Sequence, residues 1–280
     1  MSKDYYSFCF PNLDDKFQEL NKYYRGGLCI VNKEKAKKGC SFDYNSMYPS
    51  QMHSNSGNLF PIGEPVKFEG AYIKDPQRPL YLQHIKANFE IKEGHIPFIQ
   101  CKQFGYFKEE NEFIKSSEGE LVDLYFTSAE IGLFFDTYEV YELEFVDGFK
   151  FEGRCGLFDN YINKWFKIKK ESNDNPVLRM LAKLFLNNLG GKFGTSTEGF
   201  RYNIKDFKEN KAVMDQEKVS RKGVYLPVAI FMTSYARLEL LNAINANLEN
   251  FCYCDTDSLH LDCSPDEVKG LNIDPVELCN

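Results

Sequence analysis

The segment Tyr253-Cys254-Asp255-Thr256-Asp257-Ser258 lies between two short runs in which apolar and polar residues alternate. Such alternation is typical of strands, so residues 251–261 are predicted to form a strand, a turn and a second strand. Side chains two residues apart on an extended segment face the same way, so Asp255 and Asp257 are expected to present paired carboxylates at the hairpin tip. Like charges so close are unfavourable unless a cation lies between them, and Mg²⁺ accepts such oxygen ligands. The alternative is an ordinary polar turn, because Asp, Thr and Ser are common turn residues.

A third carboxylate, Asp43, belongs to a predicted strand that begins at Cys40 and stops at Tyr48-Pro49, since proline cannot donate to a central ladder. An aspartate at a strand end is usually a cap or a turn residue. Neighbouring strands lie about 4.8 Å apart. If this strand pairs beside the hairpin, the three carboxylates can hold two cations at the ~3.5–4 Å spacing of two-metal phosphoryl-transfer sites.

Helical periodicity is found at residues 157–170, 176–193 and 227–248. Asn175 is expected to cap the second of these helices, with Pro176 in its first turn. A helical projection predicts a buried stripe and a separate basic ridge that has no acidic residue. Lys169 of the preceding helix is expected to face this ridge and form a cationic clamp for a triphosphate, although a solvated helix face is the ordinary alternative. The predicted stripe is Leu178, Leu181, Ala182, Phe185 and Leu189, and the predicted ridge is Arg179, Lys183, Asn187 and Gly190.

The rest of the chain shows other patterns of apolar and polar residues. Short alternating pieces between Asn55 and Phe151, separated by Gly and Pro, predict a separate β-rich subdomain, and residues 195–223 predict an exposed hairpin or loop. The 280 residues are 43% hydrophobic and 27% charged, which favours a globular protein, and the net charge of -7 argues against one that coats nucleic acid. The nine cysteines include no CxxC pair, so reduced thiols in cytosol are expected. No apolar run predicts a membrane span or a signal peptide.

Several of these segments, taken in order, resemble the motifs of family B DNA polymerases, and above all those of the protein-primed bacteriophage branch. Asp43-Tyr44-Asn45-Ser46-Met47-Tyr48-Pro49 resembles DxxSLYP, the segment from Lys183 to Gly191 resembles KxxxNSxYG, and the segment from Tyr253 to Ser258 resembles YxDTDS. Tyr24-Arg25-Gly26-Gly27 resembles the branch's YxG(G/A) linker, and Thr233-Ser234-Tyr235-Ala236-Arg237 its Tx2GR-like primer-template segment.

The resemblance implies an α+β fold, in which a palm is built on an antiparallel sheet and carries helical fingers and two insertions. On this basis residues 1–27 form a leader and linker, 28–54 and 224–280 the two parts of the palm, and 157–194 the fingers. Residues 55–156 correspond to the first insertion, which in the family contacts the terminal priming protein. Residues 195–223 correspond to the second insertion, a hairpin linked to processivity and strand displacement.

The resemblance also implies roles for individual residues. The catalytic and metal-binding residues for Mg²⁺ or Mn²⁺ are Asp43, Asp255 and Asp257. Nucleotide-binding residues are Asn45 and Ser46 near the phosphates, Tyr48 under the sugar, Lys169, Arg179 and Lys183 on the triphosphate, and Asn187 beside the nascent base pair. DNA-binding residues are Tyr24, Gly26, Gly27, Thr233 and Arg237. The partners are primer-template DNA, deoxynucleoside triphosphates and a terminal protein, in the cytoplasm of a bacterial host with the gene carried by a phage, prophage or plasmid.

The sequence departs from the family pattern in two ways. Gly190 stands where the family has tyrosine, and Asn188 where it has serine. Too few residues precede Asp43 for the exonuclease, and too few follow Asp257 for the thumb, so a palm-and-fingers core is expected, with uncertain activity on its own. The expected function is template-directed DNA synthesis. The alternatives are a non-catalytic remnant that binds DNA or terminal protein and, less favoured, a metal-dependent nuclease.

Overall fold

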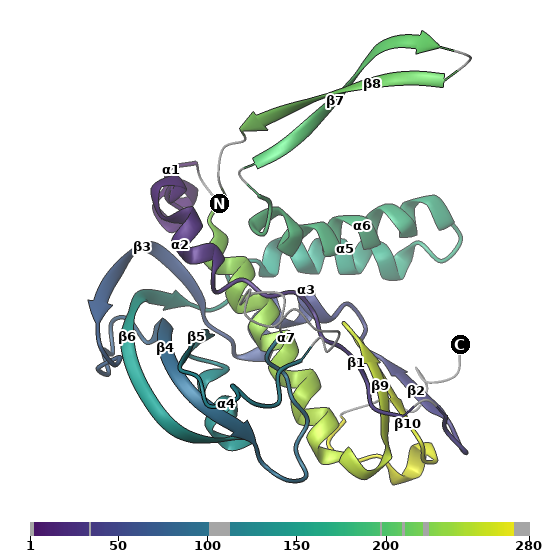
Figure 1. The fold of residues 1–280 in the computed structure, drawn as a ribbon. Helices are drawn as coiled ribbons and strands as arrows, with labels where there is room; N and C mark the ends of the chain where they lie inside the picture. The colour runs from purple at the N-terminus through teal and green to yellow at the C-terminus, as the bar shows by residue number, and fades with distance from the viewer. Residues whose placement is uncertain are drawn as a thin grey trace.

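A long apolar helix, α7 (Leu226–Ala246), lies between two antiparallel sheets (Figure 1). The computed structural model describes residues 3–33, 35–100, 113–196, 198–208, 211–220 and 224–271. Because α7 is apolar on nearly all sides, it is buried along most of its length. Within the described residues no helix is both long and apolar enough to cross a bilayer. The observed mixture of helices and antiparallel sheets confirms the predicted α+β class.

The first sheet has the strand order β1-β9-β10-β2. Its strands are β1 (Cys29–Val31), β9 (Phe251–Asp255), β10 (Ser258–Leu261) and β2 (Cys40–Asp43), which confirms the predicted strand-turn-strand. Ser258 is paired with Asp255 on one side and with Asp43 on the other. The prediction that the β2 strand continues to Pro49 is wrong. Pro49 lies in the first turn of α3 (Met47–Met52), where the missing N–H removes no helical hydrogen bond.

The second sheet has the order β3-β6-β4-β5 and occupies the predicted β-rich region. Its strands are β3 (Phe60–Glu69), β6 (Tyr138–Arg154), β4 (Leu80–Ile91) and β5 (Val122–Thr127), and α4 (Ile131–Thr137) precedes β6. The predicted segment also includes residues 101–112, which lie outside the described residues. Side chains of this sheet share one hydrophobic core with α7 and the first sheet, so the region is packed onto the rest instead of standing apart.

Two antiparallel helices, α5 (Asp159–Glu171) and α6 (Pro176–Phe193), lie side by side (Figure 1). As predicted, the Asn175 side chain caps α6 by accepting a hydrogen bond from the backbone N–H of Leu178. The predicted buried stripe is largely wrong, since the helix turns a different face inward. Leu178, Leu181 and Phe185 are 39%, 41% and 44% exposed, whereas the buried residues are Ala182, Leu186, Gly190 and Phe193. Gly190 thus leaves the predicted basic ridge and faces α7.

The remaining elements are short or project from the body. α1 (Lys3–Cys9) and α2 (Phe17–Asn21) lie near the start of α7, and a 3-10 turn (Asp14–Lys16) comes directly before α2. Further 3-10 turns span Ser54–Ser56, Leu248–Asn250 and Pro265–Glu267. β7 (Glu198–Lys208) and β8 (Lys211–Ser220) form a hairpin that extends away from the helices (Figure 1). This confirms the hairpin predicted in that region.

Candidate active site

The turn between β9 and β10 places the predicted carboxylates at one edge of the first sheet. Thr256 has a left-handed backbone with φ of 55°, and the N–H of Asp257 donates to the carbonyl of Asp255 at 2.6 Å. The N–H of Tyr44 donates to the carbonyl of Asp257 at 2.7 Å, which ties the turn to the end of β2. Asp257 therefore lies in the turn itself. The expectation that it follows strand alternation with Asp255 is corrected, because the strand ends at Asp255.

Electrostatics at this turn shows which charges lie near Asp257. Partial burial raises the pKa of Asp257, and the negative charges of Asp43 and Asp255 raise it further, while Lys183 acts in the opposite direction. Asp255 is engaged differently, because the Thr256 hydroxyl donates to its Oδ1 at 3.0 Å. Two mutually repelling carboxylates fit a cation, since Mg²⁺ is often bound by one or two carboxylates together with substrate phosphates.

The described residues provide two carboxylates as metal ligands and do not provide a complete coordination shell. In the part of the chain that is described, no three His, Cys, Asp or Glu side chains are close enough to hold one ion. The donor set of Asp43 and Asp257 thus fits Mg²⁺ or Mn²⁺ with its remaining coordination positions left for water and substrate oxygens.

Lys169 of α5 reaches the loop between β2 and α3. Its Nζ donates to Asn45 Oδ1 at 2.9 Å and to Ser46 Oγ at 3.2 Å. Ser46 has a left-handed backbone with φ of 57° at the start of α3, a conformation that costs energy in a residue other than glycine and is frequent at functional sites. Three predicted nucleotide-binding residues are thus in direct contact.

The predicted residues of α6 separate into two positions. Lys183 is exposed and lies close enough to Asp257 to act on its pKa, which it lowers. Arg179 instead donates from Nη1 to Asn173 Oδ1 at 2.6 Å in the loop between α5 and α6. Asn187 is exposed on the same helix. The structure therefore brings Lys183 toward the carboxylates and holds Arg179 against the loop between α5 and α6.

The Tyr24–Gly27 segment packs directly against the β9–β10 turn. A Cβ added to Gly27 would lie 2.9 Å from Thr256 Cγ2 and 3.1 Å from the Tyr48 hydroxyl, so only glycine fits without movement of those side chains. The N–H of Thr256 donates to the carbonyl of Leu28 at 2.7 Å. Burial raises the pKa of the Tyr48 hydroxyl. At the other end of the segment, a Cβ added to Gly194, the residue after α6, would lie 2.6 Å from the Tyr24 hydroxyl. The linker therefore connects the turn to the end of α6.

Thr233 and Arg237 lie inside the protein on α7 and are each 3% exposed. Thr233 Oγ1 donates to the carbonyl of Ala229 at 3.1 Å. Arg237 Nη1 donates to the carbonyls of Arg25 and Gly26 at 2.7 and 2.8 Å. The prediction that these two side chains contact DNA is corrected, because their polar atoms are used within the fold and Arg237 holds the Tyr24–Gly27 segment.

Sequence reasoning did not single out Arg25, Glu130 or Thr256 on its own account. Thr256 touches Gly27, and the buried Glu130 forms an ion pair with Arg237 at 2.6 Å. Arg25 is buried over the Phe126 ring, with its guanidinium 4.9 Å from the ring centroid. One signal was available: Arg237 is a charged residue within an otherwise apolar helix, and a buried charge requires a partner.

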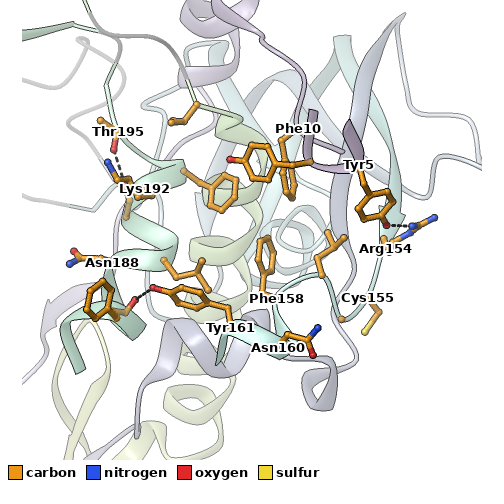
Figure 2. A pocket seen from close by; sticks show the side chains of 18 residues that line it. Tyr5, Phe10, Arg154, Cys155, Phe158, Asn160, Tyr161, Asn188, Lys192 and Thr195 are labelled. Carbon is orange, nitrogen blue, oxygen red and sulfur yellow. Dashed lines mark hydrogen bonds between the residues drawn. The ribbon is translucent and has the colours of Figure 1, made fainter. Parts of the chain in front are cut away.

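A cavity of about 1200 Å³ opens elsewhere, between α1 and the α5–α6 pair (Figure 2). Aromatic residues such as Phe10, Phe158 and Phe193 line much of it, and the Tyr161 hydroxyl donates to the carbonyl of Phe185 at 3.0 Å on one side. None of the predicted catalytic, nucleotide-binding or DNA-binding residues lines it. The candidate site is therefore the open edge of the first sheet facing α5 and α6.

Comparison with known proteins agrees with this geometry. Residues 3–269 match the model of the family "DNA polymerase type B, organellar and viral". The DNA polymerase of Bacillus phage phi29 is 40% identical over 278 residues, which cover 96% of this chain and 47% of the relative. That of Streptococcus phage Cp-1 is 36% identical, with coverage of 84% and 41%. The chain thus spans about half the length of these curated relatives.

Solved structures give the same result. The phi29 DNA polymerase complexed with primer-template DNA and incoming nucleotide has a TM-score of 0.85 and 38% identity, and the match covers 96% of this chain and 48% of that one. The same polymerase with single-stranded DNA has a TM-score of 0.81. The family match over most of the chain, the shared fold and the motif order agree: the chain belongs to the type B DNA polymerases of organelles and viruses.

Proposed function

We propose that this chain is the palm-and-fingers core of a template-directed DNA polymerase, in which Asp43 and Asp257, with Asp255 beside them, bind divalent cations. The observation that carries the proposal is the junction of β2, the β9–β10 turn and α6, where Asp43, Asp257 and Lys183 lie within electrostatic reach of one another. Opposed carboxylates next to a lysine provide for both metal ions and a phosphate chain.

In the proposed mechanism the protein's main task is to position its substrates. Lys183 and Lys169 neutralise the triphosphate, Arg179 extends the basic side of α6, and the backbone of Asn45 and Ser46 approaches the phosphates. Tyr48 lies under the sugar and Asn187 borders the base pair. Bound Mg²⁺ or Mn²⁺ would favour ionisation of the primer hydroxyl and stabilise the departing pyrophosphate. Most of the rate enhancement then comes from alignment and charge stabilisation.

The partners proposed are primer-template DNA, deoxynucleoside triphosphates and a terminal priming protein that contacts the first insertion, residues 55–156. Tyr24, Gly26 and Gly27 are proposed to face the DNA from the linker. Residues 1–27 act as leader and linker, 28–54 and 224–280 as palm, 157–194 as fingers and 195–223 as the second insertion. The proposed location is the cytoplasm of a bacterial host.

Primer extension tests the function directly. The purified chain is incubated with a labelled primer-template, all four deoxynucleoside triphosphates and Mg²⁺ or Mn²⁺. Template-dependent elongation supports the proposal. Shortening of the primer would instead identify a nuclease, and DNA binding without any change in primer length would identify a non-catalytic binding protein.

Metal binding is expected to need both Asp43 and Asp257. Mn²⁺ titrated by calorimetry should bind weakly to the chain alone and more tightly with a triphosphate present, because substrate oxygens complete the coordination shell. The double variant Asp43→Ala, Asp257→Ala should lose this triphosphate-dependent increase. Equal binding by the double variant and the original chain would contradict the assignment of these carboxylates.

Triphosphate affinity is expected to depend on Lys183 and Lys169. A charge-assisted hydrogen bond to phosphate contributes about 1.5–3 kcal/mol, so Lys183→Ala should weaken binding roughly ten- to a hundredfold. Lys169→Ala should cost less than Lys183→Ala, because Lys169 lies near the C-terminal end of α5, where fraying makes the side-chain position less fixed, and its Nζ already donates to Asn45 and Ser46. Titration with a fluorescent triphosphate measures both variants.

The control for the Lys183 and Lys169 variants is Lys170→Ala, which removes an exposed charge from α5, the helix that carries Lys169. Its affinity should stay within about twofold of the original, as is usual for a surface substitution. If all three variants weaken binding equally, general charge attraction and not a defined triphosphate site is responsible.

A further inference from the structure

A buried group of three charged residues joins the second sheet, α7 and the Tyr24–Gly27 linker. Glu130, Arg237 and Arg25 are 1%, 3% and 2% exposed. Glu130 Oε1 accepts from Arg237 Nε at 2.7 Å, and its Oε2 accepts from the Thr127 hydroxyl at 3.3 Å. Arg25 Nη2 donates to the carbonyl of Tyr125 in β5. The buried carboxylate of Glu130 is thus paired with Arg237 and lies within electrostatic reach of Arg25.

The carboxylate at the centre of this group is charged. Burial alone would raise the pKa of Glu130, but Arg237, Arg25 and hydrogen bonds from neighbouring side chains outweigh that effect and lower its pKa below the ordinary value. Burial lowers the pKa of Arg25 to about 10, and Glu130 opposes this change. Removing the carboxylate would leave two buried positive charges without their counterion, a strongly unfavourable state.

A continuous set of contacts leads from Glu130 to the turn between β9 and β10. Glu130 fixes the guanidinium of Arg237, whose Nη1 donates to the carbonyls of Arg25 and Gly26. The next residue, Gly27, packs against Thr256, and the carbonyl of Leu28 accepts from the Thr256 N–H. Thr256 stands between the two carboxylates of the turn.

We propose that Glu130, a buried residue between β5 and α4, is a positioning residue for the β9–β10 turn. It acts by holding Arg237 so that the linker backbone supports Thr256. The catalytic consequence rests on the proposed polymerase function, whereas the mechanical coupling does not. The insertion that contains the second sheet thereby contributes to the geometry of the first sheet, which it does not join by strand pairing.

Hydrogen exchange of the Thr256 amide tests the coupling without any activity measurement. In Glu130→Gln this amide should exchange at least about tenfold faster than in the original chain, since its carbonyl partner is no longer held. The control is Ser117→Ala, which removes another buried polar group of the same region, one that bonds Asn88 and the N–H of Phe89. Its Thr256 exchange should remain unchanged.

Equal acceleration in Glu130→Gln and Ser117→Ala would show general loosening and overturn the proposal, as would no acceleration in Glu130→Gln. If Glu130→Gln does not fold, Glu130→Asp replaces it. The shorter side chain keeps the charge between the two guanidiniums but withdraws from Arg237, so faster Thr256 exchange supports the proposal and unchanged exchange overturns it.

Primer extension then measures the catalytic consequence. Glu130→Gln or Glu130→Asp should lower kcat by about ten- to a hundredfold with little change in KM for the triphosphate, because misplacement of reacting groups by about 1 Å has effects of this size. Ser117→Ala should retain both constants. A rise in KM with an unchanged kcat would overturn the catalytic part. If the original chain extends no primer, the polymerase function fails, and hydrogen exchange still decides the coupling.

Discussion

Asp257→Asn is expected to reduce primer extension by at least about a thousandfold and, at the same time, to raise the melting temperature of the protein. The first effect follows from the proposed role of Asp257 as a metal ligand, because a bound metal ion supplies several kcal/mol of transition-state stabilisation and each 1.36 kcal/mol is about tenfold in rate. The second follows because burial and the charges of Asp43 and Asp255 make ionised Asp257 unfavourable. With a neutral amide that penalty disappears, so a higher Tm is expected when unfolding is measured without divalent cations.

Asp262→Asn provides a control of opposite sign. Asp262 accepts hydrogen bonds from the backbone N–H groups of Lys37 and Lys38 at 2.7 and 2.8 Å, and these bonds lower its pKa. Its ionised form is therefore stabilised by the fold, and neutralisation should lower Tm slightly while primer extension is retained. Differential scanning fluorimetry and extension assays on both variants check this. A lower Tm in Asp257→Asn would show that Asp257 is not held against other carboxylates.

Local signals explain why much of the fold was predictable. The α6 helix begins and ends where expected because Asn175 caps it, Pro176 fits its first turn, and residues after Phe193 lack helical periodicity. The β9–β10 hairpin and β2 were predictable because alternation and turn residues are properties of a few consecutive residues. The two motifs that lie on these strands then indicated which strands should meet, and Ser258 is indeed paired with both Asp43 and Asp255.

Features that depend on packing were not predictable in the same way. Apolar side chains at Leu178, Leu181 and Phe185 define an apolar stripe in the sequence, yet these are exposed, whereas the small residues Ala182 and Gly190 are buried and Gly190 lies against Met232 of α7. A helical projection gives the apolar residues and not the position of the neighbouring helix. Arg237 illustrates the same limit, because only the tertiary fold brings Glu130 to it from more than a hundred residues earlier.

Gly190→Ala is expected to destabilise the protein by about 2–3 kcal/mol, even though alanine is the better helix former. A Cβ at this position would overlap Met232 of α7, where it would lie 2.6 Å from Cε and still closer to Sδ. Because Met232 is itself buried, its side chain has little room to move, and α6 must shift away from α7. Thermal unfolding should show Tm lowered by about 5–10 °C.

The adjacent residue supplies the matched comparison. A Cβ at Gly191 meets nothing within 4 Å, so Gly191→Ala should stabilise the helix by up to about 1 kcal/mol through propensity alone. The Met232→Ala substitution leaves a cavity next to residue 190, and in the double variant Gly190→Ala, Met232→Ala this cavity receives the new methyl group. The double variant should therefore lose less stability than the sum of the losses in the two single variants. If the two losses in the free energy of unfolding were strictly additive, the Gly190→Ala substitution would not destabilise the protein through its contact with Met232. The close approach of the two helices therefore requires glycine at position 190 of this chain, because a side chain there would separate α6 from α7.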